Sequence, residues 1–76
     1  MEVRNTQQRL EVAAIHRWSV AQVRLGLLEE SPNWDADSPW HNSRFRDPAS
    51  GQAWVVYVAD HAWSGEVRLL DGRAPG

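Results

Sequence analysis

The candidate metal ligands of the chain are five side chains, three of them within seven residues. They are Asp35, Asp37, His41, Asp60 and His61. Three such ligands and a water can make a catalytic zinc site. The spacing fits no established motif, because the D-A-D segment lacks the glycine and closing glutamate of a calcium loop. Aspartates beside turns more often bond local backbone amides. We therefore expect no metal site and no cofactor.

Covalent catalysis would need a serine or threonine beside a positioned base, because the chain has no cysteine. The candidate serines all stand in turn-like contexts: Ser38, Ser43, Ser50 and Ser64. The chain has no G-x-S-x-G elbow, no dinucleotide-binding glycine pattern and no P-loop. A chain of 76 residues also has little wall with which to enclose a substrate pocket. The sequence therefore predicts no catalytic residues and a non-enzymatic role.

The segment SPNWDADSPWHNSRF, residues 31–45, places two of the five tryptophans of the chain in a predicted loop. Loops normally run over the surface, whereas tryptophan is rarely left in water. The indoles could fold back as a lid over an apolar face of the domain. Alternatively, aromatic rings rimmed by charge are typical of a protein-binding hot spot. On this second interpretation the partner-binding residues are Trp34, Asp35, Asp37 and Trp40.

Residues 6–29 are mostly good helix formers and predict one long helix. Asn5 or Thr6 could cap its start, and Pro32 requires it to end near residue 30. Ser19 followed by Gln22 resembles a second capping box, so the helix could be kinked there. Residues 19–28 could also be read as a strand, because Gly26 weakens a helix.

The C-terminal half predicts a three-stranded antiparallel meander over residues 43–71, followed by a flexible tail at 72–76. A short strand with Phe45 inward precedes the turn at 46–52. The segment QAWVVYVAD gives the strongest strand signal, and EVRLL forms the last strand. The predicted architecture is α+β, a single small domain over residues 1–76, with a Trp- and Asp-rich loop at 31–42. A small, mostly-β barrel is the alternative.

Two apolar stripes run along the predicted helix, although a surface helix needs only one. The first consists of Leu10, Ala14, Trp18, Ala21, Leu25 and Leu28, and we expect it to cover the sheet. The second consists of Val12, His16, Val20, Val23 and Leu27. The strongest strand is also apolar on both faces, and one helix can cover only one of them. We therefore predict a homodimer formed through the second stripe.

The net charge of −2 argues against a general nucleic-acid-binding protein. Residues 1–28 sum to +2, residues 29–40 to −4 and residues 41–76 to zero, so the acidic cluster coincides with the Trp-rich segment. A cysteine-free chain fits a reducing compartment. The polar start MEVRNTQQR has no signal-peptide core, and no apolar run reaches the length of a membrane span. We expect a cytoplasmic protein that does not contact membranes.

These features favour a small protein-binding module, a homodimeric adaptor or inhibitor that occupies the surface of a macromolecular partner. Small stand-alone proteins of this kind occur in phages and mobile elements, which is an analogy of size alone. The second hypothesis is a nucleic-acid-binding regulator that uses Arg4, Arg9, Arg17 and Arg24. The third is a small-molecule-binding domain with its site between the Trp-rich loop and the sheet.

Overall fold

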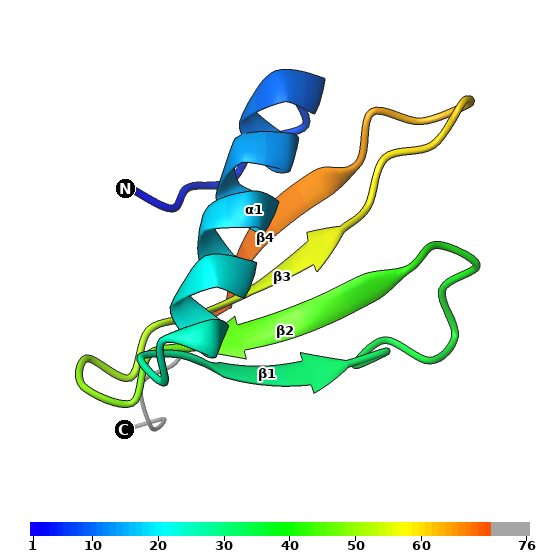
Figure 1. Ribbon diagram of the computed structural model, residues 1–76. Coiled ribbons are helices and arrows are strands. Elements are labelled where there is room, and N and C mark those ends of the chain that lie inside the picture. The colour runs from blue at the N-terminus through cyan, green and yellow to red at the C-terminus, as the bar shows by residue number, and fades with distance from the viewer. Residues whose placement is uncertain (71–76) are drawn as a thin grey trace.

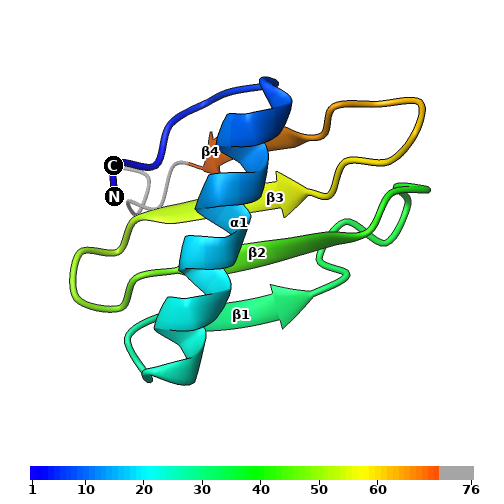
Figure 2. The ribbon, with the colours of Figure 1, turned by 45° about the horizontal axis from the view of Figure 1, so that its top comes forward.

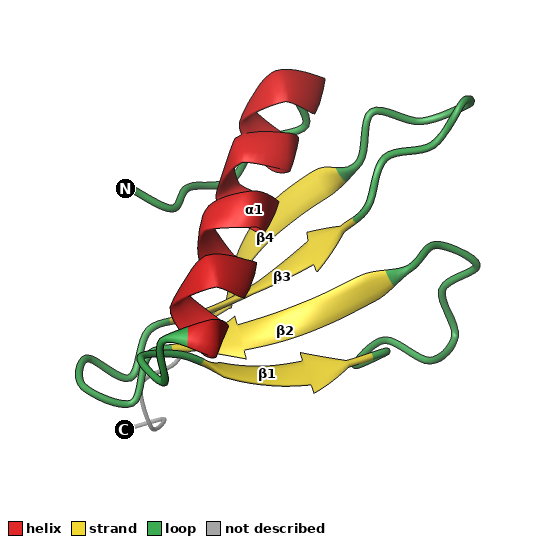
Figure 3. Cartoon of the chain, viewed as in Figure 1, coloured by secondary structure: helices red, strands yellow, loops and turns green. Residues whose placement is uncertain are grey.

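In the computed structural model, which describes residues 1–70, one helix lies across one face of an antiparallel sheet (Figure 1). The elements in chain order are α1 (Arg9–Arg24), β1 (Glu29–Pro32), β2 (Asn42–Arg46), β3 (Ala53–Tyr57) and β4 (Glu66–Leu70). Each strand pairs antiparallel with the next one along the chain. The predicted α+β class with a meander is confirmed. The sheet has four strands instead of three and is an open layer rather than a barrel, with β1 and β4 at its edges (Figure 3).

The helix begins three residues later than predicted, because the residues before it bond to the sheet. Gln8 caps α1 by accepting a hydrogen bond from the backbone N–H of Glu11 at 3.0 Å. Thr6, a predicted cap, instead exchanges two backbone hydrogen bonds with Val67 of β4, at 3.0 and 2.8 Å. The side chain of Asn5 accepts the N–H of Leu69 at 2.7 Å. Residues 5 and 6 therefore extend the sheet at its β4 edge.

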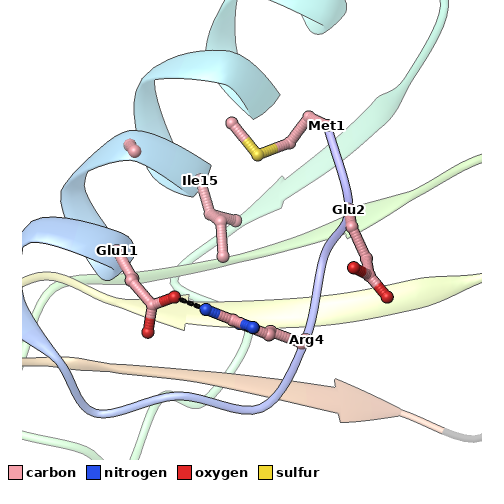
Figure 4. Close-up of a pocket in the computed structure, with 6 residues that line it drawn as sticks. Met1, Glu2, Arg4, Glu11 and Ile15 are labelled. Atoms are coloured by element: carbon pink, nitrogen blue, oxygen red, sulfur yellow. Dashed lines mark ion pairs between the residues drawn. The ribbon is translucent and has the colours of Figure 1, made fainter.

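The segment before them runs along α1 and is tied to it by charge. The guanidinium of Arg4 forms an ion pair with the carboxylate of Glu11 (Figure 4). The same carboxylate accepts the hydroxyl of Thr6 at 2.8 Å.

Helix α1 ends at Arg24, whereas the sequence predicted an end near residue 29. The chain reverses two residues later, at a glycine in the left-handed region. Gly26 has φ +78°. Its N–H donates to the carbonyl of Val23 at 3.0 Å, and the N–H of Leu27 donates to that of Gln22 at 2.9 Å. This pair of bonds is a Schellman motif with glycine at its usual position. The reversal frees residues 29–32 to form β1, although the sequence predicts the end of the helix and the start of the loop there.

No break occurs at Ser19, because this residue is a core contact rather than a cap. Its hydroxyl is fully buried, donates to the carbonyl of Ile15 at 2.7 Å and accepts the indole N–H of Trp54 at 3.1 Å. The ring of Trp54 lies between Trp18, at 6.2 Å, and Phe45, at 6.3 Å, with interplanar angles of 29° and 27°. The helix and the sheet are therefore joined by a stack of three aromatic rings and one buried hydrogen bond.

A single apolar core fills the space between α1 and the sheet, and α1 crosses the strands obliquely (Figure 2). Its buried members are Val12, Ile15, Leu28, Phe45, Trp54, Val56 and Val67. As predicted, Phe45 points inward, and β3 is a central strand that is buried along its whole length. The predicted tail at 72–76, and residue 71 of the predicted meander, lie outside the described residues.

The other face of the sheet is covered without a second layer of backbone. Val55, at the centre of that face, is completely buried. Its cross-strand neighbours are Arg44 on β2 and Arg68 on β4. Arginine stems can cover apolar surface while the charged head stays in water. The second apolar face of β3, which motivated the predicted homodimer, is therefore closed within one chain.

Strand β1 depends on contacts with β2 more than on the strand propensity of its own residues. The segment EESP has low strand propensity and ends in proline. Glu29 lies opposite Arg46 of β2 and forms an ion pair with it at 3.1 Å. Glu30 accepts the hydroxyl of Ser43 at 2.8 Å. These cross-strand pairs, together with burial of the preceding Leu28, position an edge strand that local propensity does not favour.

Replacing Ser19 with alanine should destabilise the fold by about 1–3 kcal/mol, because the indole N–H of Trp54 would be left buried without an acceptor. The free energy of unfolding from urea titration measures this loss. Ser50→Ala is the matched control, because Ser50 is exposed in a turn, and it should cost less than about 0.5 kcal/mol. Equal effects of the two variants would contradict the assigned role of Ser19.

Candidate partner-binding surface

The loop between β1 and β2, residues 33–41, is organised by one buried amide. Asn42 is only 6% exposed. Its Oδ1 accepts the N–H of Asp35 at 2.8 Å, and its Nδ2 donates to the carbonyls of Asp35 and Trp40, both at 3.0 Å. The carbonyl of Asn42 accepts the N–H of Asn33, which has φ +52°. The amide therefore ties both arms of the loop to the first residue of β2.

The carboxylate of Asp35 attaches this loop to the central strand. Its Oδ2 accepts the hydroxyl of Tyr57 at 2.8 Å. Burial of the phenol raises the pKa of Tyr57, and the hydrogen bond to Asp35 and the negative charge of that carboxylate raise it further. The guanidinium of Arg68, 5.7 Å from the centre of the ring, opposes this shift. The tyrosine is therefore held as a neutral donor.

The second loop, residues 58–65 between β3 and β4, is held in place by a side chain at the start of the helix. Arg9 donates through Nη2 to the carbonyls of Asp60 and Trp63, at 2.7 and 3.1 Å. The Oδ1 atom of Asp60 accepts the N–H groups of Ala62 and Trp63, at 2.8 and 2.9 Å. At the end of the loop, Gly65 has φ +82°, and a Cβ atom there would lie 2.6 Å from the carbonyl oxygen of Tyr57. The backbone can make this close approach only at a glycine.

Aromatic contacts join the two loops at the same end of the sheet. The ring centroids of Trp40 and Trp63 are 5.1 Å apart, and Trp63 lies 6.0 Å from Tyr57. Trp40 and Trp63 are half-buried, whereas Trp34 is 47% exposed and Asp37 is exposed. We call the surface formed by Trp34, Asp37, Trp40 and Trp63 the two-loop surface.

Of the four predicted partner-binding residues, two lie as the lid interpretation expects and two lie as the contact-surface interpretation expects. Asp35 and Trp40 make contacts within the chain, as a lid would. Trp34 and Asp37 point to solvent, as a contact surface would. Sequence reasoning missed Trp63 and Tyr57 as members of the site. The sequence contained one signal that could have identified them: Tyr57 and Trp63 stand on either side of the turn that follows the strongest predicted strand.

The predicted dimer stripe does not form one exposed face. Val12 is 2% exposed and belongs to the core, and Val20 and Val23 pack against that core. His16 is half-buried with its ring edge-on to Phe45 at 6.4 Å, so Leu27 is the only strongly exposed member, at 57%. Conversely, Leu10 and Leu25, which were expected to cover the sheet, are 76% and 69% exposed. The reason is that α1 is rotated to bury Val12, Ile15 and Ser19. The homodimer remains a prediction, without Val12 in its interface.

The residues of catalytic and metal-ligating type are dispersed. Within residues 1–70, no three His, Asp or Glu side chains gather closely enough to hold a metal ion. Ser38 and Ser50 accept nearby backbone N–H groups, and Ser64 donates to the carbonyl of Gln7 at 2.6 Å.

Within residues 1–70, no helix has the length and apolar character needed to cross a bilayer. Comparison with known proteins found no matching family model, no similar curated protein and no similar solved structure.

Replacing Asp35 with asparagine should lower the pKa of Tyr57, because the negative charge that holds the proton is removed. Tyr57 is the only tyrosine of the chain, so ultraviolet absorbance during alkaline titration reports this one group. Asp37→Asn, the same change at an exposed neighbour, is the control and should leave the titration unchanged.

The same shift determines how stability depends on pH. The pKa of Tyr57 is raised in the folded state, so its contribution is fully present below the unfolded value of about 10. That contribution is lost as the pH rises through the folded pKa. The free energy of unfolding should therefore fall between about pH 10 and the folded pKa. In Asp35→Asn the folded pKa lies closer to the unfolded value, so the total fall should be smaller. Equal titrations of wild type and Asp35→Asn would contradict the assigned hydrogen bond.

Proposed function

We propose that this chain is a non-enzymatic protein-binding module, an adaptor or inhibitor that applies its two-loop surface to a macromolecular partner. The observation that carries the proposal is the exposed indole of Trp34 on a loop whose backbone is held by the buried amide of Asn42. An aromatic anchor on a preorganised loop loses little conformational entropy on binding. Tryptophan is also among the residues most enriched in hot spots.

The surroundings of Trp34 support a partner with basic residues around an apolar pocket. Neither loop, residues 33–41 or 58–65, contains a lysine or an arginine. Carboxylates stand in both loops and at the start of β4: Asp35, Asp37, Asp60 and Glu66. Opposite charge on the partner would speed encounter and help to exclude wrong partners. The same carboxylates would repel a phosphate backbone, so the aromatic rings here favour a protein over a nucleic acid.

The half-buried pair of Trp40 and Trp63 forms the packed part of the two-loop surface, and Trp34 supplies its exposed indole. Because these rings pack on each other and on Tyr57, they keep the two loops together at one end of the sheet. Contacts that exclude water around a central anchor are the usual setting of a hot spot. We infer that Trp34 is the energetic centre and the Trp pair its border.

Trp34→Ala should weaken partner binding at least tenfold, which corresponds to about 1.4 kcal/mol or more, while the melting temperature stays nearly unchanged. Leu25→Ala is the matched control, because it shortens another exposed apolar side chain, 69% exposed, at the end of α1. Affinity capture from a lysate of the organism that encodes the chain would identify proteins retained by wild type and Leu25→Ala and lost with Trp34→Ala. Titration with the captured protein would then measure the loss.

Trp63→Ala distinguishes the supporting pair from the anchor. It should lower the melting temperature as well as the affinity, because it removes contacts with both Trp40 and Tyr57. The proposal fails if Trp34→Ala retains every captured protein at the affinity of the wild type. It also fails if Trp34→Ala melts as early as Trp63→Ala, because Trp34 would then be part of the core.

A further inference from the structure

A groove lies between α1 and the part of the sheet next to the two loops, at the start of β2 and the end of β3. Figure 2 shows that both strands extend beyond the helix on this side. The groove consists of three adjoining hollows of about 410, 510 and 400 Å³, and His16 lines all of them. One hollow lies over Val56 and Val58 of β3 and its extension, one over the start of β2, and one along the helix as far as Arg24. We call these three hollows together the helix groove.

The charge of the helix groove has one sign. Its ionisable lining residues, all within residues 1–70, are Arg9, His16, Arg17, Arg24 and His41, and none of its lining residues is Asp or Glu. Glu30, which accepts a hydrogen bond from Ser43 at the rim, is not part of the lining. In a chain with a net charge of −2, this separation of charge is a distinct feature.

A hollow on the opposite side of α1 shows the contrast. It has a volume of about 310 Å³ and is lined by residues that include Glu2, Arg4 and Glu11 (Figure 4). There the guanidinium of Arg4 is compensated by Glu11. In the helix groove, Arg9 is engaged with two loop carbonyls. Arg17 and Arg24 lie seven residues apart, about two helical turns, so they project from the same side of α1 as exposed cations.

The floor of the helix groove is aliphatic. It is formed by Val58 and Ala59 on the sheet side, beside the buried Val56, and by Ala13 on the helix side. Leu10, which is 76% exposed, stands at its rim. Single-stranded nucleic acids bind by stacking bases on aromatic rings. Within residues 1–70, the rings that line this groove are the imidazoles of His16 and His41, with no Trp, Tyr or Phe among them. An aliphatic floor beside arginines fits a ligand that carries both carboxylates and aliphatic side chains.

We propose that the helix groove binds an acidic, apolar peptide segment of a partner protein. The 16 residues of α1 extend about 24 Å at 1.5 Å per residue. An extended peptide of about seven residues has the same length at about 3.3 Å per residue. Its Leu, Ile or Val side chains would cover the floor, and its Asp or Glu carboxylates would accept paired hydrogen bonds from Arg17 and Arg24. An open, elongated groove suits such a segment better than a small molecule, which is usually enclosed.

This site shares no residue with the two-loop surface and is opposite to it in charge. A chain with two contact surfaces of opposite sign can hold a basic and an acidic partner at once. The inference does not rest on the function of Trp34, and the two can fail separately.

Selection from a library of random peptides of about seven residues tests the proposal on the intact chain. The expected sequences combine Asp or Glu with Leu, Ile, Val or Phe. Arg17→Gln and Arg24→Gln should each weaken a selected peptide about two- to fivefold, as measured by fluorescence anisotropy, because each removes one exposed charge pair. Arg46→Gln, on the other face of the sheet, is the matched control, and Trp34→Ala should retain the peptide.

Five results would overturn the proposal. The first is the absence of any enriched sequence, and the second is enrichment of sequences without acidic residues. The third is loss of a selected peptide in Arg46→Gln as much as in Arg17→Gln. The fourth and fifth concern the occupant. A single-stranded DNA oligonucleotide that displaces the peptide at lower concentration would assign the groove to nucleic acid. A wild-type dimer that Arg17→Gln dissociates in light scattering would assign it to a second copy of the chain.

Discussion

The buried bond between the indole of Trp54 and the hydroxyl of Ser19 is the constraint on which the rest of the structure depends. An indole at the centre of a sheet brings a large apolar area into a small core, but its N–H must find an acceptor there. Ser19 provides that acceptor and so sets both the rotation and the position of α1 over the sheet. The same rotation exposes Leu10 and Leu25 and turns His16 and Arg17 towards the groove. The placement of the basic residues is therefore a consequence of how the core is packed.

A chain of this size cannot cover both faces of a four-stranded sheet with backbone layers. Here the second face is closed by side chains, with Arg44 and Arg68 flanking Val55 and with Tyr57 buried at one end. The two candidate binding surfaces lie at the two loops and along the helix. Both places are fixed by side chain to backbone bonds: Asn42 within the first loop and Arg9 between the helix and the second loop.

The strands and inward-facing residues that follow a periodic pattern were predicted correctly. The elements and side-chain roles that depend on one partner far away in the sequence were missed. The segment around Trp54 predicted a central strand because both of its faces are apolar, and Phe45 was assigned to the inner side of the preceding strand because period two determines the face. Strand β1 was missed because EESP has no strand signal, and it forms because Arg46 and Ser43 lie opposite it. Ser19 resembled a helix cap because its partner, Trp54, is 35 residues away.

The candidate site was predictable only in part for the same reason. The composition of residues 31–42 indicated an aromatic and acidic contact surface, and Trp34 and Asp37 are indeed exposed there. Which tryptophan is exposed could not be read from the segment, because Trp40 is covered by Trp63 and Asp35 is engaged by Tyr57, both distant in sequence. The helix groove has no local signature, since it arises where four elements (α1, β1, β2 and β3) and two loops meet.

The short segment at residues 5 and 6 has a consequence for how this chain behaves in concentrated solution. By bonding Val67 and Leu69, Thr6 and Asn5 occupy backbone groups of β4 that would otherwise be open to pairing with another molecule. At the opposite border, β1 is four residues long, carries two glutamates and ends in Pro32, which cannot donate a backbone hydrogen bond. The two edge strands are thus protected against fibre formation by different means. Strand β1 is protected by its charges and its proline, and β4 by residues 5 and 6. Residues 5 and 6 are therefore part of the fold, and their removal would make β4 the first site of aggregation.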